Sequence, residues 1–375
     1  MLKGLNLSLL IGPLVPLPVP KNVVDALVSA QVTVSATDRS GFQLQFHFSK
    51  KSTISSAMIP AGYFDPGNRV ILVATVNGLP TVLSDGIITR QDVVPSNVPG
   101  GSTVTVTGED ISLLMALVDL TGLLDYPAMP STAIAALALA KYAAIGIIPA
   151  IIPDPFVDIK LPTTGYITHK GTDFDFIKKL ATDSGYVFYT EPGPVPGTNI
   201  AYWGPEVRFG PIQKALNINM DAETNVESLS FNFDGLLGTN QIALIQEPHT
   251  GIPIPVPIPS LSILAPPLAA RPATKLKVSF VRDVANLSIQ GAMKKALKID
   301  KESSDAVQGS GTLDVLRYGS ILKARSLVGV RGAGTAYDGL YYVKSVTHNL
   351  KPGEFKQQFS LVRNGLISIT PAVPA

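Results

Sequence analysis

Two stretches of the chain, residues 84–110 and 337–366, follow nearly the same plan, and this repetition constrains the fold more than any other feature. Each begins with an Asp-Gly pair, continues through an apolar segment, turns at glycine and ends in an alternating strand. Glycines 67, 86 and 101 lie 19 and 15 residues apart, and glycines 319, 339 and 353 lie 20 and 14 apart. Because strand patterns fill these intervals, we interpret the two stretches as one antiparallel unit used twice.

The first third of the chain has strand patterns throughout. Residues 41–48 (GFQLQFHF) alternate strictly, with Phe and Leu on one face and Gln and His on the other, which predicts a half-buried strand with one wet or interfacial side. Further strands are predicted over residues 68–76, 86–89 and 103–107, the last with threonines facing outward. We therefore expect a small antiparallel barrel or sandwich, and the family resemblance described below implies a barrel over residues 25–110. Residues 1–24, whose apolar run is interrupted by prolines, are expected to form an extended arm instead of a signal peptide.

The apolar period changes to a helical one after residue 110. Helices are predicted over residues 111–124 and 131–144, the second capped by Ser131 and ended by Gly146. A third helix begins at Thr172 as its N-cap, with Asp175 in the capping-box position, and a strand over residues 186–190 follows. Residues 111–206 are therefore expected to form a helical α+β middle domain.

The rest of the chain returns to strand patterns, and together with the family resemblance described below these imply a second, split barrel from residues 207–240 and 311–366. It includes an alternating strand at 228–233 and at least four strands between 318 and 363. Residues 241–310 form the insertion, with a proline-rich arm (248–272, including IPIPVPIP), a strand at 275–281, an amphipathic helix at 287–298 and a polar link at 301–311. Proline lacks the N–H that a helix or central strand needs, so the arm is predicted to be extended and to bind a neighbouring protein. Residues 367–375 remain as a tail. The predicted fold class is α+β, mainly β, with two duplicated antiparallel barrels and helical insertions.

Composition limits the partners of this chain. Apolar residues make up 46% and charged residues 15%, which is low for a protein whose whole surface faces water. The formal charge is +2 with dispersed Lys and Arg, so a nucleic-acid partner is not expected. The absence of cysteine excludes disulfides and thiolate chemistry. The apolar residues 132–152 contain Lys141 and Pro149, which leave too short a helix for a stable membrane span.

Motifs for catalysis or metal binding are not evident. His47, His169, His249 and His348 fall in four different segments without metal-ligand spacing. No Gly-x-Ser-x-Gly occurs; Gly309-Ser310-Gly311 lies in the polar link, and Gly332-Ala333-Gly334 is interpreted as a hairpin turn, not a phosphate loop. We therefore predict no catalytic, cofactor-binding or metal-binding residue.

Asp173 and Asp175 form the one pair of carboxylates that could cleave a glycosidic bond. Residues two apart at a helix start point to different faces, and both positions favour acids through capping and the helix dipole. A capping role accounts for both residues. The alternative, a peptidoglycan-directed glycosidase or a carbohydrate-binding module built on similar barrels, stays open at this point.

The segment TDFDFIKKLATDSGYVFY (172–189) resembles the central segment of the phage late control gene D proteins, the myophage baseplate-hub proteins and the hub portion of the valine-glycine-repeat spike proteins of type VI secretion. The matching positions are Asp173, Asp175, Phe176, Leu180, Ala181, Gly185, Tyr186, Phe188 and Tyr189. Val106-Thr107-Gly108-Glu109-Asp110 is similar to the end of the first hub barrel in that family. The closing segment, with Tyr342, Val343, His348, Gly353, Phe359, Leu361 and Arg363, is similar to its final hairpin.

This resemblance implies a structural protein of a contractile tail or injection machine. It implies a homotrimer in which three pairs of hub-type barrels face a hexameric inner tube or a tube-initiator protein. It further implies contacts with other baseplate components, assembly in the cytoplasm and no enzymatic activity. Nothing after Arg363 resembles the needle of a fused spike. A separate spike protein is therefore expected as a partner.

Overall fold

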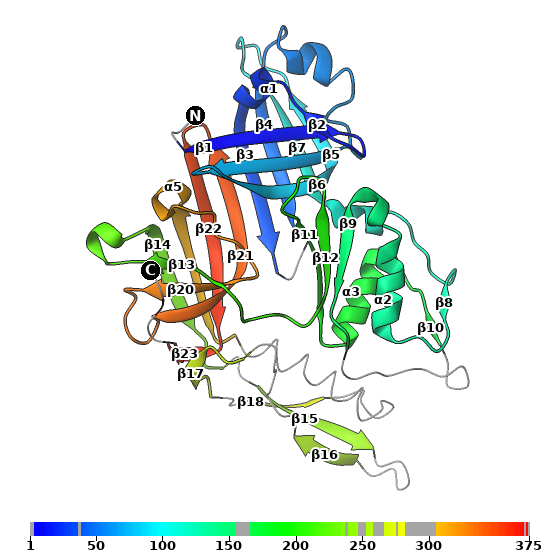
Figure 1. Ribbon diagram of the computed structural model, residues 1–375, viewed down its shortest axis with the longest axis vertical. Coiled ribbons are helices and arrows are strands. Elements are labelled where there is room, and N and C mark those ends of the chain that lie inside the picture. The colour runs from blue at the N-terminus through cyan, green and yellow to red at the C-terminus, as the bar shows by residue number, and fades with distance from the viewer. Residues whose placement is uncertain are drawn as a thin grey trace.

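A computed structural model describes residues 4–36, 39–154, 166–236, 239–246, 253–257, 266–274, 277–281, 305–370 and 373 of the chain. The fold is mainly β, as the sequence predicts, and is built on one 13-stranded sheet with a smaller helix-containing unit beside it (Figure 1). Its hydrogen-bonded path runs β14-β19-β22-β21-β3-β4-β7-β6-β5-β1-β2, with β20 and β13 branching from β21. The pairing of β21 with β3 joins the two ends of the chain into a single sheet.

The first half of this sheet consists of residues from the start of the chain. Its main strands are β1 (Leu5–Gly12), β3 (Leu27–Ser35), β4 (Gly41–Phe48), β5 (Arg69–Val76), β6 (Leu79–Val94) and β7 (Ser102–Asp110). The short elements between them are β2 (Leu17–Pro18), α1 (Lys21–Asp25) and the π-helix Ile54–Met58. The predicted strands at 41–48, 68–76 and 103–107 are confirmed, and that at 86–89 belongs to a longer one. The residues predicted as an N-terminal arm supply β1, which pairs with β5 along its length.

The second half consists of residues that follow the middle of the chain. Its strands are β13 (Ile212–Asn217), β14 (Val226–Phe233), β19 (Val307–Asp314), β20 (Leu327–Arg331), β21 (Gly339–Lys351) and β22 (Glu354–Arg363). The 3-10 turn Asp221–Glu223 and helix α5 (Val315–Tyr318) connect them. Residues 318–363 thus form three strands and not the four or more that were predicted, and one of them, β21, is 13 residues long.

The two halves repeat one order of strands. The first half runs β3-β4-β7-β6-β5-β1, and the second runs β14-β19-β22-β21-β20-β13. The last pair differs in direction, because β1 is antiparallel to β5 whereas β13 is parallel to β20.

The registers repeat as well. In the first half the pairing of β6 with β7 shifts by one residue between Ile88 and Arg90, and in the second half β21 and β22 shift between Val343 and Ser345. The outer pairs β3–β4 and β14–β19 also shift at one matching place each. Such bulges bend a strand at a fixed point.

A backbone hydrogen bond confirms the alignment of these strands. The Gly67 N–H donates to the Ile88 carbonyl at 2.9 Å, and the Arg325 N–H donates to the Val343 carbonyl at 2.8 Å. Gly67 and Arg325 both have positive φ, 96° and 61°. Gly67 and Arg325 therefore occupy equivalent backbone positions in the two halves.

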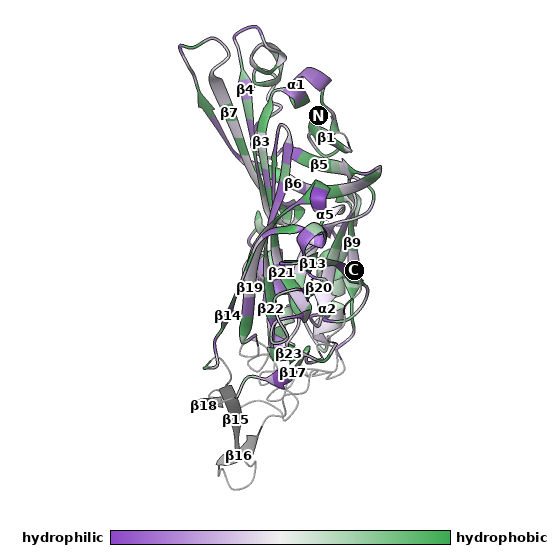
Figure 2. Ribbon diagram, turned by 90° about the vertical axis from the view of Figure 1, so that its left-hand side faces the viewer, coloured by the Kyte–Doolittle hydropathy of each residue, from purple (hydrophilic) through white to green (hydrophobic). Residues whose placement is uncertain are grey.

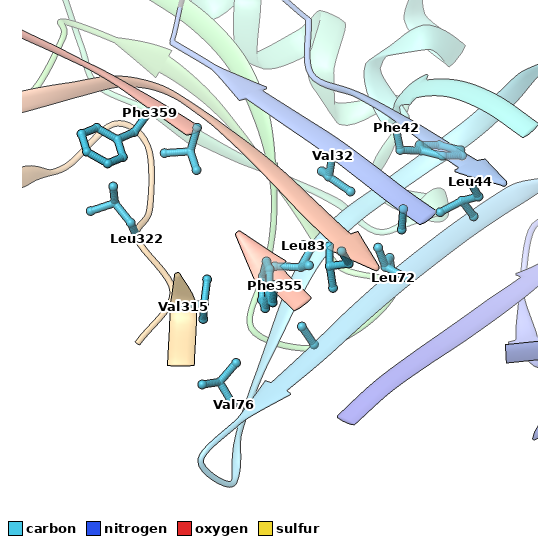
Figure 3. Packing of buried hydrophobic residues seen from close by; sticks show 14 of the residues in the cluster. Val32, Phe42, Leu44, Leu72, Val76, Leu83, Val315, Leu322, Phe355 and Phe359 are labelled. Carbon is cyan, nitrogen blue, oxygen red and sulfur yellow. The ribbon is translucent and has the colours of Figure 1, made fainter. Parts of the chain in front are cut away.

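One continuous hydrophobic core supports both halves. It joins Leu44 and Leu72 from the first half to Val315, Phe355 and Phe359 from the second (Figure 3). Among the described residues no strand pairing closes either half into a ring, so the predicted barrels appear here as open halves of one sheet folded around this core.

The middle unit, residues 111–206, packs helices on a sheet of its own. Strands β9 (Ile147–Ile151), β11 (Val187–Pro192) and β12 (Asn199–Gly204) form that sheet, and β8 (Asp125–Tyr126) pairs with β10 (Ile167–Thr168). Its helices are α2 (Ser131–Ala140), which begins one residue after the N-cap Pro130, and α3 (Asp173–Asp183) with the predicted cap at Thr172. After α2 the 3-10 turn Ala143–Ile145 ends at Gly146 in the left-handed region.

The helix predicted over 111–124 is only a 3-10 turn, Ile111–Ala116. The Asp119 carboxylate accepts hydrogen bonds from the backbone and hydroxyl of Thr121, which favours a turn over a helix.

The insertion contains β15 (Thr239–Gln246), β16 (Pro253–Pro257), β17 (Ala269–Pro272) and β18 (Lys277–Val281). β16 is an edge strand on β15, a position that tolerates proline. The tail begins with β23 (Gly365–Ser368), which pairs with β17. The predicted helix at 287–298, His249 and most of the proline-rich arm lie outside the described residues.

The predicted polar link at 301–311 is wrong in its last part, where β19 begins at Val307. Gly309 and Gly311 lie in this strand, where aromatic rings pack directly on the backbone and leave no room for a side chain. An added Cβ would lie 2.8 Å from the Phe231 ring at Gly309 and 2.6 Å from the Phe359 ring at Gly311. Gly332 and Gly334 lie, as predicted, in the connection between the antiparallel strands β20 and β21.

Candidate functional site

The largest feature with functional character is one face of the main sheet, which we call the polar face. It is made of alternate residues from strands of both halves, almost all Ser, Thr, Asn or Gln. Its members are Ser228, Ser230 and Asn232; Ser310 and Thr312; Gln358 and Ser360; Ser345, Thr347 and Asn349; Ser29, Gln31 and Thr33; Gln43 and Gln45; and Thr103, Thr105 and Thr107. The opposite side chains of the same strands, such as Leu44, Val106 and Phe359, are buried in the core.

Strand register places these polar side chains in rows across the sheet. One row runs Ser230, Ser310, Ser360, Ser345, and a second runs Thr312, Gln358, Thr347, Thr33. Neighbours in a row contact one another: Ser345 Oγ lies 2.6 Å from Ser360 Oγ, and Thr33 Oγ1 lies 3.2 Å from Thr347 Oγ1. The Gln31 amide nitrogen donates to the Asn349 amide oxygen at 3.1 Å. The Thr33–Thr347 and Gln31–Asn349 contacts cross the β3–β21 junction, so the two halves present one surface.

The polar face is open, and most of its side chains are uncharged; charged members are Lys356 opposite Asn349, Arg90 opposite Thr107 and Asp92 opposite Thr105. In the side view of Figure 2, β14, β19, β3, β4 and β7 lie along one side of the molecule, and the helix α2 with β9 and β13 lies on the other. Shallow hollows of about 340 and 410 Å³ mark it beside β14 and β19. The Ser, Thr, Asn and Gln side chains hold water well and carry no charge, so the part of the surface that they form neither attracts ions strongly nor binds apolar groups.

The carboxylate pair predicted from the sequence is separated by its contacts. Asp173 is buried, and its carboxylate accepts hydrogen bonds from Lys141 Nζ at 2.7 and 2.9 Å and from the Tyr142 hydroxyl at 2.6 Å. Asp175 is at the exposed helix start, where its carboxylate accepts from the Thr172 hydroxyl at 2.8 Å. The cap predicted at Thr172 is confirmed, because the Thr172 hydroxyl oxygen accepts from the Asp175 N–H at 3.2 Å, and Asp175 supports this cap through the Thr172 hydroxyl and not through the Thr172 N–H of a capping box. Asp173 instead fixes the end of α2 to the start of α3.

His169 completes the cluster around Asp173. It is fully buried, its Nδ1 lies 3.2 Å from the Tyr126 hydroxyl, and its Nε2 lies 3.7 Å from Asp173. Burial lowers the pKa of His169, although the Asp173 charge opposes that shift. Burial, together with the bond to Asp173, raises the pKa of Tyr142. The Asp173 carboxylate thus already has two hydrogen-bond donors, the Lys141 ammonium group and the Tyr142 hydroxyl.

His47 and His348, which the sequence analysis also considered as metal ligands, lie apart from this cluster. His47 is exposed on β4, and His348 is buried on β21 with its Nδ1 3.1 Å from the Gln357 amide nitrogen. Burial lowers the pKa of His348 to about 4. In the described part of the chain no group of three or more His, Cys, Asp or Glu side chains could hold a metal ion. No helix among the described residues has the length and apolar character needed to cross a membrane.

Sequence reasoning found the polar face only in fragments. The wet side of residues 41–48 and the outward threonines of 103–107 were predicted. The alternation at 228–233 was also noted, but its polar side was not connected with theirs. The missing information is the β3–β21 pairing, which joins segments some 310 residues apart.

Comparison with solved structures identifies the fold. The chain is similar to the 43 kDa tail protein of prophage MuSo2 from Shewanella oneidensis, with a TM-score of 0.64 and 16% identity over 96% of this chain and 98% of that one. It is similar to a tail protein from Neisseria meningitidis, with a TM-score of 0.62 and 14% identity over 97% and 98% of the two chains. The chain has the fold of phage tail proteins. No family model and no curated protein sequence matches it.

This tail-protein fold extends to secretion machines. A component of the Escherichia coli type VI secretion system, itself described as similar to the bacteriophage T4 tail proteins gp27 and gp5, matches with a TM-score of 0.55 and 11% identity over 92% of this chain and 76% of that one. The resemblance to tail and spike-hub proteins predicted from residues 172–189 is therefore confirmed at the level of the fold.

Proposed function

We propose that this protein is a structural baseplate hub of a contractile phage tail or a tail-like injection machine. Three copies form a ring that joins a hexameric inner tube to a trimeric spike, and the polar face lines the channel of the ring. The observation that carries this proposal is the polar face itself, which continues without a break over both halves of a tail-protein fold.

A duplication of one hub barrel explains the repeated pairing. The strand orders, the shifted registers and the bonds at Gly67 and Arg325 agree between the halves. Three copies with two equivalent halves each present six similar modules, the number that a hexameric tube requires. The domains we propose are an arm (1–24), a first barrel (25–110), a middle domain (111–206), a second barrel (207–240 and 311–366), an insertion (241–310) and a tail (367–375).

The polar face, most of whose side chains are uncharged, suits a channel wall. A chain or nucleic acid that passes must not be retained, and strong charge or apolar patches would retain it. The rows of Ser, Thr, Asn and Gln have neither property, and their cross-strand bonds hold the side chains in place. The bonded rows keep the hydroxyl and amide groups of the proposed wall in fixed positions.

The proposed partners follow from the position of a hub. They are two further copies of this chain, a separate spike protein, the inner tube or a tube-initiator protein, and other baseplate components, which assemble in the cytoplasm. The proline-rich insertion is proposed to bind one of these neighbours. We propose no catalytic centre, since both oxygens of Asp173 are bound to Lys141 and Asp175 caps its helix.

Purification alone and with a co-expressed spike protein tests this function. Light scattering is expected to give three copies per particle, and electron microscopy a ring with a central channel. A protein that stays monomeric under both conditions, with no ring, would contradict the hub. Release of peptidoglycan fragments by the wild type, lost in a folded Asp175→Asn variant, would contradict the structural role.

A further inference from the structure

Two strand edges of the main sheet are free in the described part of the chain. β14 pairs only with β19, and residues 89–94 of β6 pair only with β7. Free edges of this length invite pairing with another chain unless something covers them. The repeat relates β14 to β3 and β6 to β21, and β3 and β21 are the two strands that pair where the halves meet.

The second half shows how such edges are joined. Residues 345–350 of β21 pair with β22 on one side and with β3 of the first half on the other. The register shifts make β6 the equivalent of β21, with Arg90 in the place of Ser345. They make β14 the equivalent of β3, with Ser228 in the place of Ser29. The β21–β3 junction within the chain therefore has a counterpart that only another copy can complete, namely β6 with β14.

Transfer of the register fixes which residues meet. Within the chain, Ser345 is opposite Ser35 and Thr347 is opposite Thr33. Because Ser228 is equivalent to Ser29, Asn232 is equivalent to Thr33 and Asp234 to Ser35 along the same two strands. The equivalent junction thus sets Arg90 opposite Asp234, and Asp92 opposite Asn232.

The chemistry of the two edges is complementary. Arg90 has a side chain that is 72% exposed and forms an ion pair with Asp92 at 2.8 Å, which leaves guanidinium N–H groups for a second acceptor, and Asp234 is also exposed. The cation and the anion would meet across the junction. Exposed apolar side chains accompany them on both edges, Val93 at 42% and Val94 at 61% on β6 and Phe233 at 39% on β14. In the inferred register Val94 is opposite Ser230, and Phe233 is opposite Gln91.

We infer that β6 of one copy pairs antiparallel with β14 of the next copy, with Arg90 opposite Asp234 of the partner subunit. This interface rests on the proposed hub function, because it uses the duplication that the hub proposal assumes. It extends the polar face from copy to copy, since Asp92 and Asn232 lie on the same side of the sheet as Thr105 and Ser310. Each copy then has no free edge at these strands.

Cysteine cross-linking tests the register in a chain that has no natural cysteine. The variant Asp92→Cys/Asn232→Cys is expected to oxidise into linked dimers and trimers that a reducing agent separates. Thr33→Cys/Thr347→Cys, whose parent hydroxyls lie 3.2 Å apart within one chain, is the positive control and stays at monomer size. Asp92→Cys/Ser228→Cys is the control for register, because Ser228 is roughly 13 Å further along its strand.

The outcomes separate the interface from the hub function. Links at 92/232 but not at 92/228 support the inferred pairing. Equal linking in both variants, or none in either while light scattering still finds a trimer, overturns the pairing and leaves the hub function standing. A monomer in every condition, including co-expression with the spike protein, overturns both.

A charge exchange gives a second test without cysteine. Arg90→Glu places two carboxylates in opposition and is expected to raise the concentration needed for assembly several-fold. The double variant Arg90→Glu/Asp234→Arg is expected to restore it. Failure of the double variant to restore assembly, with both proteins folded by circular dichroism, contradicts the pairing of these two residues.

Discussion

Arg69 and Asp85 form a buried ion pair with two parallel hydrogen bonds, Nε to Oδ1 at 2.6 Å and Nη2 to Oδ2 at 2.7 Å. They lie on the neighbouring strands β5 and β6 of the first half. The remaining guanidinium N–H groups donate to the carbonyls of Ile145 and Gly197 in the middle unit, each at 3.0 Å. The Asn199 amide nitrogen donates to Asp85 at 2.9 Å. One ion pair thus attaches the middle unit to the main sheet.

Asp85→Asn is expected to destabilise the protein by about 3–5 kcal/mol, because it leaves the Arg69 charge buried without a counter-charge. Chemical denaturation measures the free energy of unfolding. The control is Asp183→Asn, which breaks the exposed Lys179–Asp183 pair and is expected to cost less than about 1 kcal/mol. Equal losses in the two variants would show that the buried pair has no special role.

The two acids at the start of α3 are expected to differ when replaced. Asp175→Asn weakens a helix cap and should cost about 0.5–2 kcal/mol. Asp173→Ala removes the partner of Lys141 and Tyr142 from a buried site and should cost more, about 2–4 kcal/mol, because a buried hydroxyl and an amine lose their acceptor and a void forms. Thermal unfolding of both variants gives the order, and a larger loss for Asp175→Asn would contradict the assignment of the cluster.

Individual strands could be predicted from the sequence, but the exact correspondence between the two halves could not. Local alternation predicted β4 and β7, which have one buried face each, and a continuous apolar run predicted β5, which is buried on both faces. The glycine spacing was a poorer guide. The backbone equivalent of Gly67 is Arg325, not Gly319, because both donate to matching carbonyls with positive φ. Arg325 tolerates this backbone because its guanidinium stacks on Tyr189, 3.8 Å from the ring centre, and reaches Glu191.

The candidate site depends on contacts that no local pattern contains. The polar face becomes one surface only through pairing between strands from opposite ends of the chain. Asp173 was interpreted as a cap, because its spacing from Thr172 carries no sign of the Lys141 amine that comes from another helix. Turn residues were easier to predict from the sequence. Gly100 and Gly353, which both have positive φ, precede β7 and β22, the last strands of the two halves, as expected.

Stability is expected to fall as the pH is lowered from about 6.5 to about 4, with His348 as a main cause. Burial lowers its pKa to about 4 in the folded protein, whereas the unfolded chain titrates near the ordinary value of 6.5. Between these values the unfolded state binds more protons, so protonation favours unfolding. The loss is up to about 3 kcal/mol. His348→Gln should flatten the profile, and His47→Gln, which changes an exposed ring, should leave it as it is. A profile unchanged by His348→Gln would contradict this origin.

Gly311→Ala is expected to destabilise the second half of the sheet. An added Cβ would lie 2.4 Å from the Ser228 carbonyl oxygen and 2.6 Å from the Phe359 ring, and the carbonyl belongs to the paired strand β14 and cannot move freely. Overpacking of this kind costs about 1–3 kcal/mol. Gly235→Ala is the matched control, because its added Cβ would meet only the Phe233 ring, at an ordinary 3.7 Å. If β14 holds the partner subunit as inferred, Gly311→Ala should also weaken assembly, since it displaces the strand that supplies the free edge. Denaturation and light scattering on the same samples would show both effects, and a variant as stable as Gly235→Ala would mean that the close ring packing over β19 is not required.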